Sequence, residues 1–81
     1  MPYITEVQRE VLKTGLVSPK NCGELNYCFT MLIIRYLAEN GLKYQTCNDI
    51  VGALENAKDE FQRRVQHPYE DRKISENGDV Y

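Results

Sequence analysis

The sequence predicts an all-α protein: an antiparallel helical hairpin with a short N-terminal helix and a short C-terminal helix, assembling as a homo-oligomer. Apolar residues recur at three- and four-residue spacing through two long segments, which is the pattern of a helix face. Glycine and proline residues separate these segments. The chain has 81 residues, and a chain of this size buries only about 60% of the surface that its unfolded form exposes. We therefore expect a second copy to cover part of the apolar surface.

The first helix is predicted to begin after Thr5, whose side chain can cap the first turn, and to end at about Lys13. Glu6 stands near the positive end of the helix dipole, where a carboxylate is favourable. Gly15 ends the helix, and the glycine, proline and asparagine residues of segment 15–23 predict a loop. The apolar stripe of this helix consists of Val7, Val11 and Leu12.

The second helix, residues 24–40, has the clearest periodicity in the chain. Its apolar face consists of Leu25, Cys28, Phe29, Leu32, Ile33, Tyr36 and Leu37. Met31 and Ile34 widen this face, which indicates burial on two sides, one by the chain itself and one by a partner. The pair Asn40-Gly41 ends the helix, because glycine tolerates the left-handed conformation of a C-terminal cap.

The third helix is predicted to be capped by Thr46 and to run to about Gln66. Because only a short turn precedes it, the second and third helices should form the antiparallel hairpin. Its inner face consists of Ile50, Ala53, Leu54, Ala57, Phe61 and Val65. Pro68 suits the first turn of a fourth, short helix, which Gly78 ends. No repeat or linker divides the chain, so residues 1–81 are predicted to form one domain.

The charge balance excludes one class of partner. The chain has ten Lys and Arg and twelve Asp and Glu, for a net charge of -2. Proteins that hold the phosphate backbone of DNA or RNA carry a basic excess, so we expect no extended nucleic acid as a partner. A small anionic ligand needs only a local basic pocket and stays compatible with this composition.

Cysteine spacing and hydropathy indicate the compartment. Cys22, Cys28 and Cys47 show no Cys-x-x-Cys spacing, which predicts structural roles, and reduced thiols fit an intracellular protein. The N-terminus has no signal-peptide pattern, and the longest apolar cluster, residues 31–34, is too short to span a membrane. We expect a cytoplasmic protein with no membrane partner.

Residues that suggest catalysis are few. Glu55 and Asp59 lie one helical turn apart and together can hold Mg²⁺, as a metal-dependent nucleotide hydrolase would require. Such enzymes need a second acidic cluster facing the first, however, and the neighbouring Lys58 favours an ordinary charged surface. His67, the single histidine, stands at a helix end, where it suits the dipole. We therefore predict that the chain is not an enzyme, needs no cofactor and holds no metal.

Residues suited to a nucleotide-derived ligand are better represented. Arginine presents a planar fork to phosphate, tyrosine presents a flat face to a base, and helix starts offer free N–H groups to anions. The predicted ligand-binding residues are Asn26, Tyr27, Asn48, Lys58, Arg63, Arg64, Tyr69 and Tyr81. The two arginines can alternatively form ordinary surface ion pairs with nearby carboxylates. The final pair, Val80-Tyr81, is more apolar than a typical disordered terminus, which predicts that it docks on another subunit.

A series of short motifs runs through the chain. They are Gly-Glu-Leu-Asn-Tyr (23–27), Arg-Tyr-Leu (35–37), Gly-Leu-x-Tyr-Gln-Thr (41–46), Asn-Asp-Ile (48–50), Gly-Ala-Leu-Glu-x-Ala-Lys (52–58), Glu-Phe-x-Arg-Arg (60–64), Pro-Tyr-Glu-Asp-x-Lys (68–73) and Glu-Asn-Gly-Asp-Val-Tyr (76–81). With these motifs the chain resembles a family of very short phage and prophage proteins that is known only as a domain of unknown function. The similarity covers nearly the whole chain except residues 14–22, and its most specific part is the ending.

The resemblance implies a phage setting but no chemistry. Small helical phage proteins that oligomerise include sponges, which bind and sequester nucleotide signals of bacterial immunity such as cyclic dinucleotides and cyclic ADP-ribose. By this analogy of size and setting, we expect a phage-encoded sponge that counteracts anti-phage defence in the host cytoplasm. A sponge needs pockets between subunits, lined by positive and aromatic groups. The alternative is a helical protein that inhibits or adapts a host or phage protein through its exposed second helix.

Overall fold

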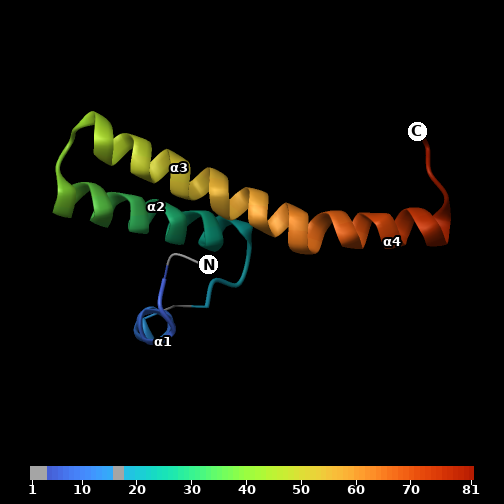
Figure 1. Cartoon of the computed structure of the whole chain (residues 1–81), viewed down its shortest axis with the longest axis horizontal. Coiled ribbons are helices and arrows are strands. Elements are labelled where there is room, and N and C mark those ends of the chain that lie inside the picture. The colour runs from blue at the N-terminus through green and yellow to red at the C-terminus, as the bar shows by residue number, and fades with distance from the viewer. Residues whose placement is uncertain (1–3, 16–17) are drawn as a thin grey trace. The chain divides into compact units, whose positions relative to one another are not determined.

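Every regular element in the described part of the chain is a helix. The computed structural model describes residues 4–15 and 18–81. The elements are α1 (Glu6–Thr14), α2 (Cys22–Asn40), α3 (Tyr44–Phe61), the π-helical turn η1 (Gln62–Gln66) and α4 (His67–Asn77) (Figure 1). The predicted all-α class is therefore confirmed, while residues 16 and 17 of the predicted first loop lie outside the described ranges.

Contacts within the chain divide it into two units, Met1–Leu32 and Ile33–Tyr81. Helix α2 runs through this division, so its first half belongs to the first unit and its second half to the second. A single domain and an antiparallel hairpin of α2 and α3 stay predictions. None of the helices in the described residues is long and apolar enough to cross a membrane.

Helix α1 begins with the predicted cap. The Oγ1 atom of Thr5 accepts a hydrogen bond from the Gln8 N–H at 3.2 Å, and the Thr5 N–H donates to the Gln8 side chain at 3.0 Å. These two bonds form a capping box, which satisfies backbone donors at both positions. The apolar stripe of the helix is uncovered, since Val7 is 74% exposed and Val11 is 66% exposed.

Helix α2 begins two residues earlier than predicted. The side-chain oxygen of Asn21 accepts from the Glu24 N–H at 2.9 Å, and the Glu24 carboxylate accepts from the Lys20 N–H at 3.0 Å. Asn21 therefore caps the helix, and Cys22 already lies in it. The predicted end is confirmed: Gly41 adopts φ = 83°, and its N–H bonds to the Leu37 carbonyl at 2.8 Å.

Thr46 is not the cap of α3, and this prediction was wrong. The extended residue Lys43 precedes the helix, so Tyr44 is its first residue and Thr46 lies in its first turn. The Thr46 side chain is 1% exposed, and its hydroxyl has no hydrogen-bond partner in the described structure. The helix begins early because the chain is already extended at Lys43 after the left-handed turn at Gly41.

One side-chain hydrogen bond connects α2 and α3 inside the second unit. The Tyr36 hydroxyl donates to the Asp49 carboxylate at 2.9 Å, and the Gln45 amide donates to the same carboxylate at 2.6 Å. The bond to Asp49 is the largest cause that raises the pKa of the Tyr36 phenol above its ordinary value, followed by desolvation and by the negative charge of Asp49.

The fourth helix begins as predicted, with Pro68 in its first turn, and a π-helical turn joins it to α3. The chain stays helical through η1, where the His67 N–H bonds to the Gln62 carbonyl, five residues back. Pro68 lies in the first turn of α4 and has no N–H group to donate. The wider turn before Pro68 accommodates the proline without ending the helix. Gly78 then ends α4 with φ = 87°, as predicted.

The described residues form no apolar core. Thr46 is the sole buried residue among them, and all the large apolar side chains of α2 and α3 are at least partly exposed. Phe29 of α2 is 45% exposed and Phe61 of α3 is 57% exposed. Within the described residues, packing therefore covers the large apolar side chains only in part.

We predict that Asp49→Asn lowers the pKa of Tyr36 toward its ordinary value. Because folding raises this pKa, the stabilisation from the Tyr36 bond is fully present below about pH 10 and is lost as the pH rises through the raised pKa. A ¹³C NMR titration of the tyrosine ring carbons measures the change. Asp59→Asn, on the exposed surface of the same helix, should leave the Tyr36 titration unchanged. An unchanged Tyr36 pKa in Asp49→Asn would contradict the bond.

We predict that Asn21→Ala destabilises α2 by about 1 kcal/mol, because the Glu24 N–H loses its side-chain acceptor. Thermal unfolding followed by circular dichroism, at one fixed protein concentration, measures the loss. The matched control is Asn56→Ala, since Asn56 is exposed in the middle of α3 and alanine favours a helix interior. Equal melting temperatures for Asn21→Ala and the unaltered chain would rule out the cap.

Candidate functional site

The basic residues predicted to bind phosphate differ in their partners. The ammonium of Lys58 lies 3.4 Å from the Glu55 carboxylate, and the guanidinium of Arg64 lies 3.4 Å from the Glu60 carboxylate. Arg63 is exposed and forms no ion pair or side-chain hydrogen bond within the described residues. Exposed ion pairs contribute about 0–1 kcal/mol, so an incoming phosphate can displace them. Arg63 is the member of this set whose guanidinium can bind a phosphate without first giving up an ion pair.

Tyr69 lies beside two cations that sequence reasoning missed. The Arg72 guanidinium is 5.9 Å from the centre of the Tyr69 ring, and the Lys73 ammonium is 5.5 Å from it. These contacts join residues three and four positions apart on α4, which are neighbours on a helix surface. The i+3 and i+4 spacing after Tyr69 was therefore a signal in the sequence. We call Tyr69, Arg72 and Lys73 the basic–aromatic cluster.

Asn26 and Tyr27 belong to the first unit, whereas the other predicted ligand residues belong to the second. Asn26 is exposed, and its backbone carbonyl accepts from the Thr30 hydroxyl at 3.1 Å. The Tyr27 side chain is 64% exposed. The first half of α2 therefore holds both side chains at the surface.

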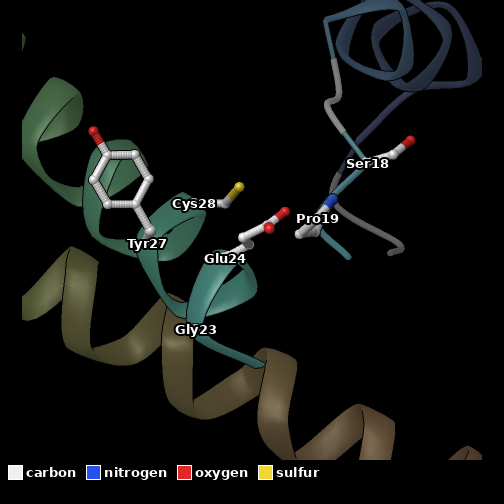
Figure 2. Close-up of a pocket in the computed structure, with 6 residues that line it drawn as sticks. All are labelled: Ser18, Pro19, Gly23, Glu24, Tyr27 and Cys28. Carbon is white, nitrogen blue, oxygen red and sulfur yellow. The ribbon is translucent and has the colours of Figure 1, made fainter. Parts of the chain in front are cut away.

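A hollow of about 390 Å³ lies between the start of α2 and the segment that precedes it. Its lining consists of Ser18, Pro19, Gly23, Glu24, Tyr27 and Cys28. Figure 2 shows the Glu24 and Cys28 side chains pointing toward Pro19, while the Tyr27 ring extends away from that segment. The charged group here is a carboxylate that already accepts from the Lys20 N–H. This chemistry does not suit a phosphate, so the hollow is a poor candidate for the predicted ligand.

Asn48 lies deeper in α3 than predicted, and the docking of Tyr81 on another subunit stays a prediction. Because α3 begins at Tyr44 and the Cys47 N–H already bonds to the Lys43 carbonyl, Asn48 lies beyond the free N–H groups of the helix start. The Tyr81 side chain has no protein cover in this chain, and its N–H bonds to the Asp79 carboxylate at 2.9 Å. Neither side chain shares a described contact with the basic–aromatic cluster.

The carboxylates considered for a metal have other contacts. Glu55 pairs with Lys58, and Asp59 is exposed one turn further along α3. Within residues 4–15 and 18–81, no three acidic, cysteine or histidine side chains are arranged to share a metal ion. His67 contacts the Glu70 carboxylate at 2.9 Å on α4. The two residues thus form a local pair near the start of that helix.

Comparison with known proteins places the chain in a family. A family profile described as "Domain of unknown function (DUF6899)" matches residues 1–80. No curated protein and no solved structure shows significant similarity to the chain. The resemblance expected from the motifs is confirmed to the extent of a family without an assigned function. Since the match extends over nearly the whole sequence, the chain belongs to the DUF6899 family.

Proposed function

We propose that the chain assembles as a homo-oligomer that binds and sequesters a small nucleotide-derived anion. The ligand class is a cyclic dinucleotide or an isomer of cyclic ADP-ribose, and the setting is a phage that counteracts bacterial defence in the host cytoplasm. The observation that carries this function is the combination of exposed cations with aromatic rings on helices that have no buried apolar core. The phage setting rests on the sequence resemblance alone.

Assembly is supported by the lack of apolar burial. Large apolar side chains are exposed on both long helices, including Leu32 at 60% and Phe61 at 57%. Water contact with such side chains costs free energy in proportion to their area, at about 25 cal/mol per Å². A second copy removes this cost from both chains at once. Assembly also creates concave surfaces between subunits, which are the usual location of small-ligand pockets.

Recognition of an anionic ligand is supported by the charges of the second unit. Arg63 offers an unpaired guanidinium, and the basic–aromatic cluster of α4 holds two more cations beside a ring. One of these two, Lys73, forms an exposed ion pair with Glu76 at 3.4 Å, which a phosphate can displace. A guanidinium binds phosphate oxygens with two parallel hydrogen bonds, and a phenol ring stacks on a base.

A second function is favoured by α2. Its apolar side chains Phe29, Met31 and Leu32 are between 44% and 60% exposed. A helix with such a face can lie in a hydrophobic groove of another protein. On that alternative the chain inhibits or adapts a host or phage protein, and the cations of the second unit act only as surface charges.

We predict that one member of a panel of cyclic dinucleotides and cyclic ADP-ribose isomers binds in isothermal titration calorimetry. The bound ligand should be recovered intact after heating the complex, because sequestration leaves its bonds unchanged. Affinity should fall as salt rises, since part of the binding is between charges. Absence of binding by every member would overturn the function, and recovery of a degraded ligand would assign the chain to the enzymes instead.

We predict that Arg63→Ala weakens binding of that ligand by about 10- to 100-fold, which corresponds to losing a hydrogen bond to a charged group. The matched control is Arg9→Ala, because Arg9 is an exposed arginine of α1 outside the predicted site. Circular dichroism should show equal helix content in both variants. Equal affinity of Arg63→Ala and Arg9→Ala would remove Arg63 from the site.

A further inference from the structure

Asparagine followed directly by glycine occurs twice in the chain, as Asn40-Gly41 and as Asn77-Gly78. Asparagine is chemically least stable in this pair, because glycine has no side chain to hinder the attack of its backbone nitrogen on the asparagine amide. Both pairs stand at the C-terminal end of a helix, the first at the end of α2 and the second at the end of α4. The structure therefore allows a matched comparison of the two pairs.

The reaction of such a pair is deamidation, which consumes water and releases ammonia. At Asn77 a bond forms between the Gly78 backbone nitrogen and the side-chain carbon Cγ, and the bond from Cγ to the amide nitrogen breaks. The amide nitrogen leaves as ammonia, with the proton that the Gly78 nitrogen gives up. Water then opens the cyclic succinimide to aspartate or to isoaspartate, in which the backbone runs through the side chain. The step requires that the glycine N–H and the asparagine amide first leave their other hydrogen bonds.

The backbone protects the two pairs equally. Gly41 and Gly78 both have a positive φ, of 83° and 87°. The Gly41 N–H donates to the Leu37 carbonyl at 2.8 Å, and the Gly78 N–H donates to the Ile74 carbonyl at 2.8 Å. Both asparagines are exposed. A difference in reactivity must therefore come from the asparagine side chains or from the ease with which each helix end opens.

The side chain of Asn40 is held by a hydrogen bond, whereas that of Asn77 is not. The Asn40 amide nitrogen donates to the Tyr36 carbonyl at 2.9 Å. In the part of the chain that the structure describes, the Asn77 side chain forms no hydrogen bond. The Asn40 amide must therefore break a bond before Gly41 can attack it, and the net free energy of that bond slows the reaction.

The end of α4 also opens more easily than the end of α2. Helix α3 begins at Tyr44, shortly after α2, and the Tyr36 hydroxyl bonds to the Asp49 carboxylate of α3 at 2.9 Å. Opening the last turn of α2 therefore disturbs a connection between two helices. Residues 78–81 form no regular element, and Val80 is 94% exposed. Local opening needs least free energy where few contacts hold the backbone, which is the case at the end of α4.

We infer that Asn77-Gly78 is a site of spontaneous deamidation and that Asn40-Gly41 is protected from it. The product carries a carboxylate at the C-terminal end of α4, where the helix dipole is already negative. Glu76 and Asp79 flank this position and repel the new charge. Isoaspartate also lengthens the backbone and displaces the Gly78 N–H from its carbonyl partner. The reaction therefore loosens the end of α4, independently of the proposed ligand and of the proposed assembly.

Peptide mass spectrometry tests the site. The full chain is incubated in mildly alkaline buffer, sampled over time and digested at acidic pH. We expect aspartate and isoaspartate to form at position 77 at least about fivefold faster than at position 40, which is the ratio that one intramolecular hydrogen bond accounts for. In concentrated urea the two rates should converge, since glycine follows both asparagines. Equal rates in the folded chain, no product at position 77, or the same ratio in urea would each overturn the inference.

Hydrogen exchange followed by NMR at neutral pH tests the consequence for α4. Asn77→Asp reproduces the aspartate product, and it should lower the protection factor of the Gly78 N–H by about two- to fivefold, because its charge opposes the helix dipole. The matched control is Asn56→Asp, which adds the same charge in the middle of α3. Equal protection of the Gly78 N–H in both variants would overturn the predicted loosening of α4.

Discussion

Burial of apolar side chains is the constraint on which the rest of this structure depends. A helix satisfies its own backbone hydrogen bonds, so each helix here is well defined by local contacts such as the capping box at Thr5. The apolar face of a helix contributes free energy to folding only when other protein removes it from water. In the described residues the single buried side chain is a threonine, Thr46, which is polar. The helices are thus complete as secondary structure and incomplete as packing, and the proposed assembly rests on the second of these facts.

Much of the fold was predictable because its signals are local. The cap at Thr5 and the stops at Gly41 and Gly78 depend on a few adjacent residues, and these positions agree with the structure. The error arose where two signals compete. Thr46 has the chemistry of a cap, but the helix had already begun at Tyr44. Such competition is decided by backbone geometry that residue types alone do not specify.

The sequence predicts which cations belong to the candidate site, but it does not predict which of them is free of an ion pair. From the sequence, Lys58, Arg63 and Arg64 are equivalent cations, since each has carboxylates within a few residues. The structure separates them, because Lys58 and Arg64 each lie 3.4 Å from a carboxylate oxygen, whereas Arg63 forms no ion pair within the described residues. Sequence spacing does not foresee this difference, because Asp59 precedes Arg63 by four residues just as Glu60 precedes Arg64. The backbone of η1 departs from the 3.6-residue turn over residues 62–66, and residue types alone do not specify this departure.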